Sequence, residues 1–224
     1  PLAEAIEKSV GGFADKTREL AERRPIRITA PGAFASRVMD LISEFAALNP
    51  GVAFEFIPSL KTLNLSGGEA DIALRVTKSE QDKTLICRAI STAQWALFGG
   101  RSYSDKLGLP KSPEEFQGHR FVTFQHDDVP DYLHNWLVRQ VSPDQIVMSF
   151  SEVDLMQAAI RAGHGLGLVN LRMAASDGAL IRCFDNIEEL SRSNMMLIAP
   201  DAYRRPEVKA FTRFFAPRYA ATFK

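Results

Sequence analysis

Alternating and periodic apolar positions divide the chain into short strands and amphipathic helices. Residues 26–29 alternate apolar and polar side chains and predict a strand, which Ala30-Pro31-Gly32 interrupts. Apolar residues then recur at helical spacing from Phe34 to Leu48, and Pro50-Gly51 ends the run. The pattern therefore predicts a strand, a tight loop and a helix whose first backbone N–H groups lack intrahelical partners and can hold a small anion.

The same alternation continues along the chain and predicts an α/β fold built from βαβ units. Residues 1–23 carry a short heptad stripe and predict a helix, either packed on the following domain or belonging to a longer coiled coil. A short helix is expected at 59–65, and longer ones at 131–140, from Ser151 to Gly163 and from Pro206 onward. We predict the remaining strands at residues 52–57, 71–76, 85–90, 93–98, 121–124, 146–150, 166–169, 180–184 and 195–199.

Composition limits the function classes. Lys plus Arg and Asp plus Glu both number 27 in the 224 residues, so no net charge draws this chain to DNA or anionic lipid. No apolar run reaches the length of a membrane span, and the start lacks both a secretory signal and an initiator Met, which suggests a fragment or processed product. We expect a cytoplasmic protein in which Cys87 and Cys183 are buried thiols rather than a disulfide.

Few residue patterns point to catalysis or metal binding. Gly163 to Gly167 is similar to a dinucleotide loop, but it follows a helix and precedes a strand, which is the wrong order. The run from His126 to Asp131, with His134, lacks tetrahedral metal-ligand spacing. We predict no metal, no cofactor and no enzymatic activity, with an enzyme using His126 or Asp128 as an alternative.

Two positions are candidates for ligand binding. Ser151 can cap the helix that follows it, with Asp154 three residues later. Arg75 ends a buried-looking strand near the same sheet edge as Pro31. It forms either a surface ion pair or a charge-assisted contact to an anionic ligand, and the sequence favours neither.

The order and spacing of several motifs resemble those of the effector-binding domain of LysR-type transcriptional regulators. These motifs are residues 27–31 with Phe34, residues 45–50 with Val52, residues 68–75, residues 162–169 and residues 206–215. The resemblance implies two Rossmann-like lobes joined by two crossing strands, as in periplasmic binding proteins, preceded by a linker helix. Mapped onto this chain, the linker helix is 1–24, lobe I is 25–100 plus 195–224, and lobe II is 101–194.

The resemblance also implies a small-molecule effector, often a carboxylate, held between the lobes. Where many relatives carry Ser or Thr, this chain has Ala33, which suggests a less polar effector or recognition through backbone N–H groups and Ser36. The positions that match the family's cleft are Pro31, Gly32, Ala33, Phe34, Arg75, Phe124, Gln125, Ser151, Glu152, Val153 and Asn170.

In this interpretation the ligand alters lobe and oligomer geometry and so controls transcription. The resemblance implies homodimers or homotetramers, no membrane association, and DNA binding only through a helix-turn-helix domain absent from these residues. A transport-type solute-binding protein of the same architecture is the main alternative, and the missing export signal and the N-terminal heptad stripe disfavour it.

Overall fold

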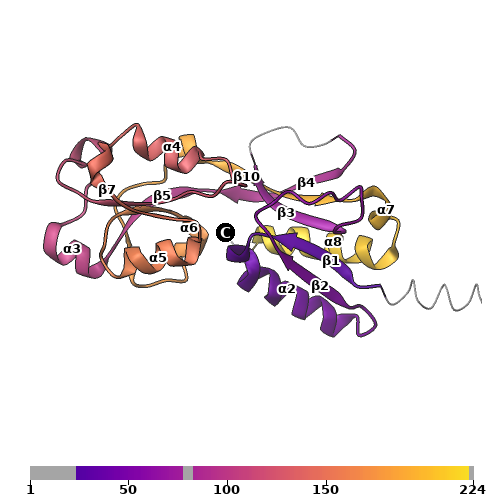
Figure 1. Ribbon diagram of the computed structural model, residues 1–224. Coiled ribbons are helices and arrows are strands. Elements are labelled where there is room, and N and C mark those ends of the chain that lie inside the picture. Colours follow the sequence, from indigo (N-terminus) through magenta and orange to yellow (C-terminus); the bar gives the residue numbers. More distant parts are fainter. Residues whose placement is uncertain (1–23, 78–82, 222–224) are drawn as a thin grey trace, which may run out of the picture.

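A computed structural model describes residues 24–77 and 83–221, which form two α/β lobes (Figure 1). Lobe I denotes the part built on the five-stranded sheet, and lobe II the part built on the remaining strands. The expected linker helix at 1–24 lies outside the described residues except for Arg24. Within the described ranges, no helix combines the length and hydropathy that crossing a bilayer requires.

Lobe I contains a mixed sheet in the order β2-β1-β3-β10-β4. Strands β1, β2 and β3 run parallel, and β10 runs antiparallel to both β3 and β4. The strands are β1 (Ile26–Ala30), β2 (Phe54–Pro58), β3 (Ile72–Thr77), β4 (Ile86–Ala93) and β10 (Arg192–Ile198).

Two long helices, the one between β1 and β2 and the one at the C-terminal end, cover one face of this sheet. Between β1 and β2 lie η1 (Gly32–Phe34) and α2 (Ala35–Leu48), while α7 (Pro200–Tyr203) and α8 (Pro206–Ala221) follow β10. Phe45 of α2 meets Phe211 of α8 edge to face, with ring centroids 5.3 Å apart, over the buried apolar face of β1 and β3. A smaller core that includes Leu65 and Ala73 fills the other face.

Lobe II combines a three-stranded sheet, in the order β8-β5-β9, with the parallel pair β6 and β7. Its strands are β5 (Trp95–Gly100), β6 (Phe121–Phe124), β7 (Ile146–Phe150), β8 (Gly167–Asn170) and β9 (Leu180–Arg182). Its helices are α3 (Arg101–Leu107), η2 (Pro113–Glu115), α4 (Tyr132–Val138), η3 (Pro143–Gln145), α5 (Val153–Arg161), α6 (Leu171–Ala174) and η4 (Glu188–Leu190).

Helices α4 and α5 lie on opposite faces of lobe II. The apolar core beside α4 contains Trp136 and Leu168, whereas the core beside α5 contains Met156 and Val169. Leu168 and Val169 are consecutive in β8, and successive strand side chains point to opposite faces. The strands of lobe II therefore have apolar side chains on both faces, as expected for strands covered on both sides.

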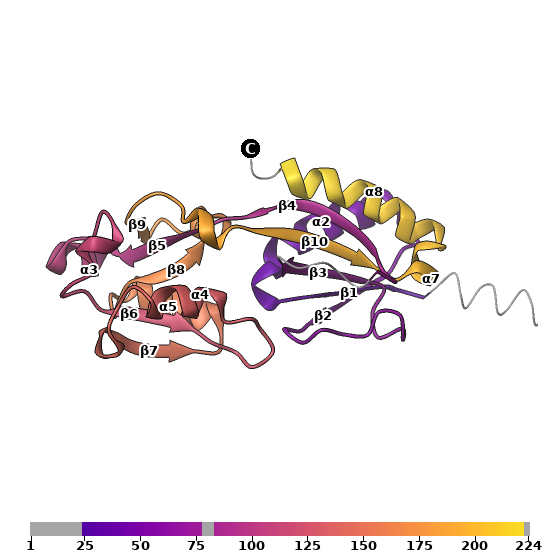
Figure 2. The ribbon, with the colours of Figure 1, turned by 90° about the horizontal axis from the view of Figure 1, so that it is seen from above.

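The chain passes between the lobes twice, once from β4 into β5 and once into β10 (Figures 1 and 2). The two-lobe fold class expected from the resemblance is confirmed. The domain bounds stay a prediction. We propose placing the first crossing at Gln94 instead of Gly100, because β5 pairs with β8 and β9 of lobe II.

Three local expectations are wrong. Residues 59–65 contain no helix, because the side chains of Asn64 and Glu69 bond backbone N–H groups of the loop instead. Ser151 does not cap α5, which begins at Val153 with Glu152 at the N-cap position and no side-chain cap bond. Cys87 is exposed and Cys183 is half-buried.

Candidate functional site

The carboxyl ends of the parallel strands in each lobe point toward the other lobe (Figure 2). In lobe I the chain leaves β1 toward β2 on one side and leaves β3 toward β4 on the other. In lobe II it leaves β6 toward β7 and leaves β8 toward β9. Each lobe therefore has a topological switch point, one between β1 and β3 and one between β6 and β8, and such points are where open α/β sheets bind ligands.

The loop after β1 lies at the lobe I switch point. Phe34 donates its backbone N–H to the Pro31 carbonyl over 2.9 Å, which closes the short η1 turn before α2. Gly32 is exposed, and a Cβ placed there would meet no atom within 4 Å. The Phe34 side chain packs against the lobe I core. Of these residues, Gly32 borders open space. Ala33 is the middle residue of η1.

Arg75 occupies the same switch point and holds three neutral acceptors. Its guanidinium donates to the hydroxyl of Thr29 over 3.2 Å, to the Lys61 carbonyl over 2.9 Å and to the Leu74 carbonyl over 2.9 Å. Burial lowers the pKa of Arg75 to about 10, which still leaves the group charged at neutral pH. Among the described residues no carboxylate pairs with it, so the expected alternative of a surface ion pair is not seen there.

The surroundings of the Arg75 guanidinium favour an anion beside it. A partly desolvated cation with neutral partners lacks the compensation that a counter-charge supplies, so an anion placed beside it gains a charge-assisted hydrogen bond. The bond to the Lys61 carbonyl also attaches the loop after β2 to the sheet. Arg75 can therefore hold the loop and attract an anion at once.

Two of the predicted lobe II residues lie at the end of β6. Phe124 ends the strand half-buried and packs against the core beside α5. Gln125 is exposed, donates its backbone N–H to the Phe150 carbonyl over 2.9 Å and accepts a hydrogen bond from the Ser149 hydroxyl over 3.1 Å. The ends of β6 and β7 are thus tied together at the switch-point side of the lobe.

The remaining predicted residues follow β7 and β8. Ser151 and Glu152 are exposed, and Val153 is half-buried at the first turn of α5. Asn170 is buried and caps α6 by accepting the Arg172 N–H over 3.0 Å. Its Oδ1 atom already has a structural partner. The roles of all eleven residues in ligand binding stay predictions.

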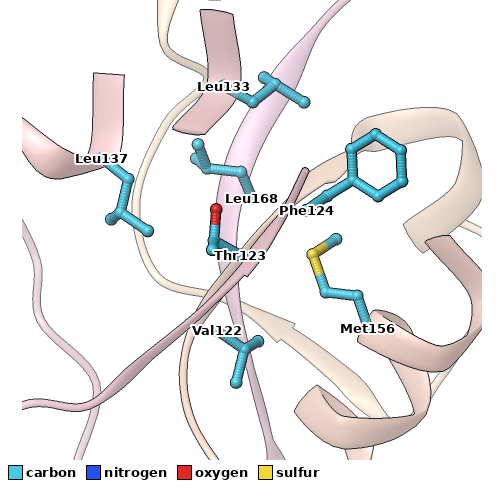
Figure 3. A pocket seen from close by; sticks show the side chains of 7 residues that line it. All are labelled: Val122, Thr123, Phe124, Leu133, Leu137, Met156 and Leu168. Atoms are coloured by element: carbon cyan, nitrogen blue, oxygen red, sulfur yellow. The ribbon is translucent and has the colours of Figure 1, made fainter. Parts of the chain in front are cut away.

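A small cavity lies inside lobe II at its switch point (Figure 3). Strands β6 and β8 are joined at Phe121 and Leu166, where the Val122 N–H donates to the Leu166 carbonyl over 2.8 Å. Beyond this point they separate into different sheets. The cavity occupies the opening and has a volume of about 10 Å³. It is lined by Val122, Thr123, Phe124, Leu133, Leu137, Met156 and Leu168.

Of these lining residues, the sequence predicted only Phe124 as a site residue. The apolar ones fit the periodicity of core positions, so nothing in the pattern separated them from ordinary core. The only signal was Thr123, a polar residue within an apolar strand. Its buried hydroxyl lies 3.2 Å from Nδ1 of His134.

The other candidate clusters do not form sites in the described residues. His126 Nδ1 lies 3.8 Å from Asp128, while His134 contacts Thr123 instead, and no group of three or more His, Cys, Asp or Glu side chains could hold a metal within the described ranges. Gly163 to Gly167 connects α5 to β8 with His164 exposed, as the order of elements predicted.

Comparison with known proteins identifies the family. Residues 21–220 match the model of the LysR substrate binding domain. The chain belongs to this family. The match confirms the resemblance seen in the motifs and favours a regulator over a transport-type solute-binding protein.

Individual relatives agree with this assignment. An HTH-type transcriptional regulator of Xanthomonas campestris pv. campestris (strain 8004) is 26% identical over 203 residues, which cover 86% of this chain and 59% of that protein. The chain thus spans about three-fifths of the length of this relative.

Two solved structures share the fold. The regulatory domain of CrgA, a LysR-type transcriptional regulator from Neisseria meningitidis, has 18% identity and a TM-score of 0.75 over 90% of this chain and all of its own. Full-length AphB, a Vibrio cholerae virulence activator, has 21% identity and a TM-score of 0.64, covering 94% of this chain and 76% of its own.

Proposed function

We propose that this LysR-type regulatory domain senses a small organic anion that binds between the two switch points. The observation that carries the proposal is Arg75, a charged and partly buried guanidinium whose described partners are all neutral. It lies on β3 beside Thr29 of β1, at the carboxyl ends where α/β sheets receive ligands. The exposed backbone at Gly32 adds the start of a helix, which favours negative charge.

The anion would act by favouring one arrangement of the lobes. A ligand that contacts both lobes shifts the equilibrium only by the difference between its affinities for the two arrangements. Coupling free energies of about 1–3 kcal/mol are typical and are sufficient to change promoter occupancy. In the parent regulator, a helix-turn-helix domain outside this chain would bind DNA in the cytoplasm. Homodimers or homotetramers would transmit the change, without catalysis.

An acid panel tests the proposal. Small mono- and dicarboxylates are screened by thermal shift, and binding at a hundred times Kd should stabilise the domain by about 2.7 kcal/mol. For the best acid, Arg75→Gln should weaken binding about tenfold to hundredfold in calorimetry, since hydrogen bonds to charged groups contribute about 1.5–3 kcal/mol.

The matched control is Arg88→Gln. Arg88 also lies in the lobe I sheet, but its guanidinium donates to the Tyr203 hydroxyl over 2.7 Å, away from the switch point. This variant should bind the acid as the wild type does. Equal affinity of the wild type and Arg75→Gln for every acid that binds would remove the anion site from lobe I.

A further inference from the structure

The small cavity in lobe II lies between β6 and β8. Its walls come from both faces of the lobe, with Leu133 and Leu137 of α4 on one side and Met156 of α5 on the other. Figure 3 shows Phe124 and Met156 together on the side of the cavity opposite Leu137. The opening exists because β6 and β8 part after Leu166, toward the carboxyl ends that point to lobe I.

The lining selects for an apolar guest. Six of the seven side chains are apolar, and the one hydroxyl, on Thr123, already lies within hydrogen-bond distance of His134. A polar group placed there would lose its hydration without gaining partners, which is unfavourable. The volume of about 10 Å³ is close to that of a single water-sized sphere, so the cavity can admit one or two carbon atoms but not a whole metabolite.

The two switch points therefore offer opposite chemistry, a cation in lobe I and an apolar slot in lobe II. We propose that the slot between β6 and β8 binds a short alkyl group of the effector, whose anionic end is held by Arg75. The ligand class is then an organic acid with a methyl or ethyl substituent remote from its carboxylate. This inference deepens the proposed function and rests on it.

A series of acids of increasing length tests the slot. The 224-residue chain, labelled with ¹³C in its methionine methyl groups, is titrated with acetate and with the straight-chain acids from propionate to octanoate at constant ionic strength. Met156→Leu assigns the Met156 signal. Each methylene that enters the slot should lower Kd about fourfold, the equivalent of the free energy of burying one CH₂. The Met156 methyl signal should shift with the acids that are long enough to reach the slot and should not shift with acetate.

Variants that change the size of the slot distinguish its contribution to binding from that of the anion site. Leu133 is half-buried, so Leu133→Phe should fill the slot, abolish the chain-length gain and leave the Kd of acetate unchanged. Leu133→Ala should extend the gain by a further methylene. Val138 lies on the same helix but is 41% exposed and outside the lining, so Val138→Phe and Val138→Ala should keep the wild-type series.

The outcomes distinguish the two proposals. A wild-type series without chain-length dependence, or one that Leu133→Phe leaves intact, overturns the slot while acetate binding through Arg75 still supports the sensor. A chain-length gain that survives in Arg75→Gln with every Kd unchanged supports the slot and overturns the anion site. Failure of every acid in the series to bind overturns the slot, and the wider panel of mono- and dicarboxylates then tests the sensor separately.

Discussion

At the scale of single residues, Asp71, which directly precedes β3, connects several segments of lobe I. Its carboxylate is 3% exposed and accepts the Arg27 backbone N–H over 2.9 Å. It also pairs with Arg205 at 3.1 Å and with Arg24 at 3.4 Å. These contacts hold the first described residue and the start of α8 against the sheet.

Removing this charge should destabilise the domain. Asp71→Asn keeps the size of the side chain but leaves Arg205, whose side chain is 18% exposed, without its carboxylate at this position. We expect a loss of about 2–3 kcal/mol in the free energy of unfolding, measured from urea denaturation. Glu55→Gln, which breaks an ion pair with Arg27 at a side chain 50% exposed, should cost about 0–1 kcal/mol. Equal losses of stability in Asp71→Asn and Glu55→Gln would show that burial does not make the Asp71 ion pairs more stabilising than the exposed one.

No sequence pattern could have predicted the Asp71 cluster, because Asp71 and Arg205 are separated by 134 residues and local periodicity carries no information about such pairs. Arg75 was different. Its position at the end of an apolar strand predicts a place at a sheet edge, although its neutral partners are not predictable from sequence.

At the scale of elements, the sequence predicted best where apolar runs are bounded by polar residues. Strands β6 and β7 have the expected bounds, because both are continuous runs of strand-forming residues. The helices α3, α6 and α7 were not predicted. They contain four to seven residues each, too short for helical periodicity to show, and depend on contacts with the rest of the fold.

The contact between α5 and β5 leads to a prediction about Gly100. A Cβ at this position would overlap the backbone carbonyl oxygens of Ile160 and Arg161 at the end of α5. Because backbone atoms cannot rotate away, Gly100→Ala should destabilise lobe II by about 1–3 kcal/mol in urea denaturation. Gly178→Ala, where nothing lies within 4 Å, should change stability little. If Gly100→Ala leaves the free energy of unfolding unchanged, α5 is not held tightly against β5.

At the scale of the whole molecule, the two lobes have separate interiors. None of the apolar core clusters among the described residues draws side chains from both lobes. The chain crosses between them twice, and the Arg172 guanidinium of lobe II lies over the Tyr219 ring of lobe I, 5.6 Å from its centroid. The sequence predicted this division from the resemblance. It did not predict the cavity at the lobe II switch point, because that depends on where two strands part, which no local pattern encodes.

Separate interiors predict that the lobes unfold in separable steps. Both tryptophans of the chain, Trp95 and Trp136, lie in lobe II, so their fluorescence reports on that lobe alone. Asp71→Asn should lower the midpoint measured by circular dichroism more than the midpoint measured by fluorescence, and Gly100→Ala should lower the fluorescence midpoint. Coincident transitions in both variants would show that the crossings couple the lobes into one cooperative unit.

The pairing at the crossings has a consequence for engineering. Ala93 and Arg192 are opposite each other in neighbouring antiparallel strands, so lobe II is in effect an insertion at the tip of a hairpin within lobe I. A tight turn joining these two positions would reconnect β4 to β10 directly. Related proteins with the same pairing could therefore exchange this inserted half as a module, and chimaeras would reveal which half sets the choice of signal.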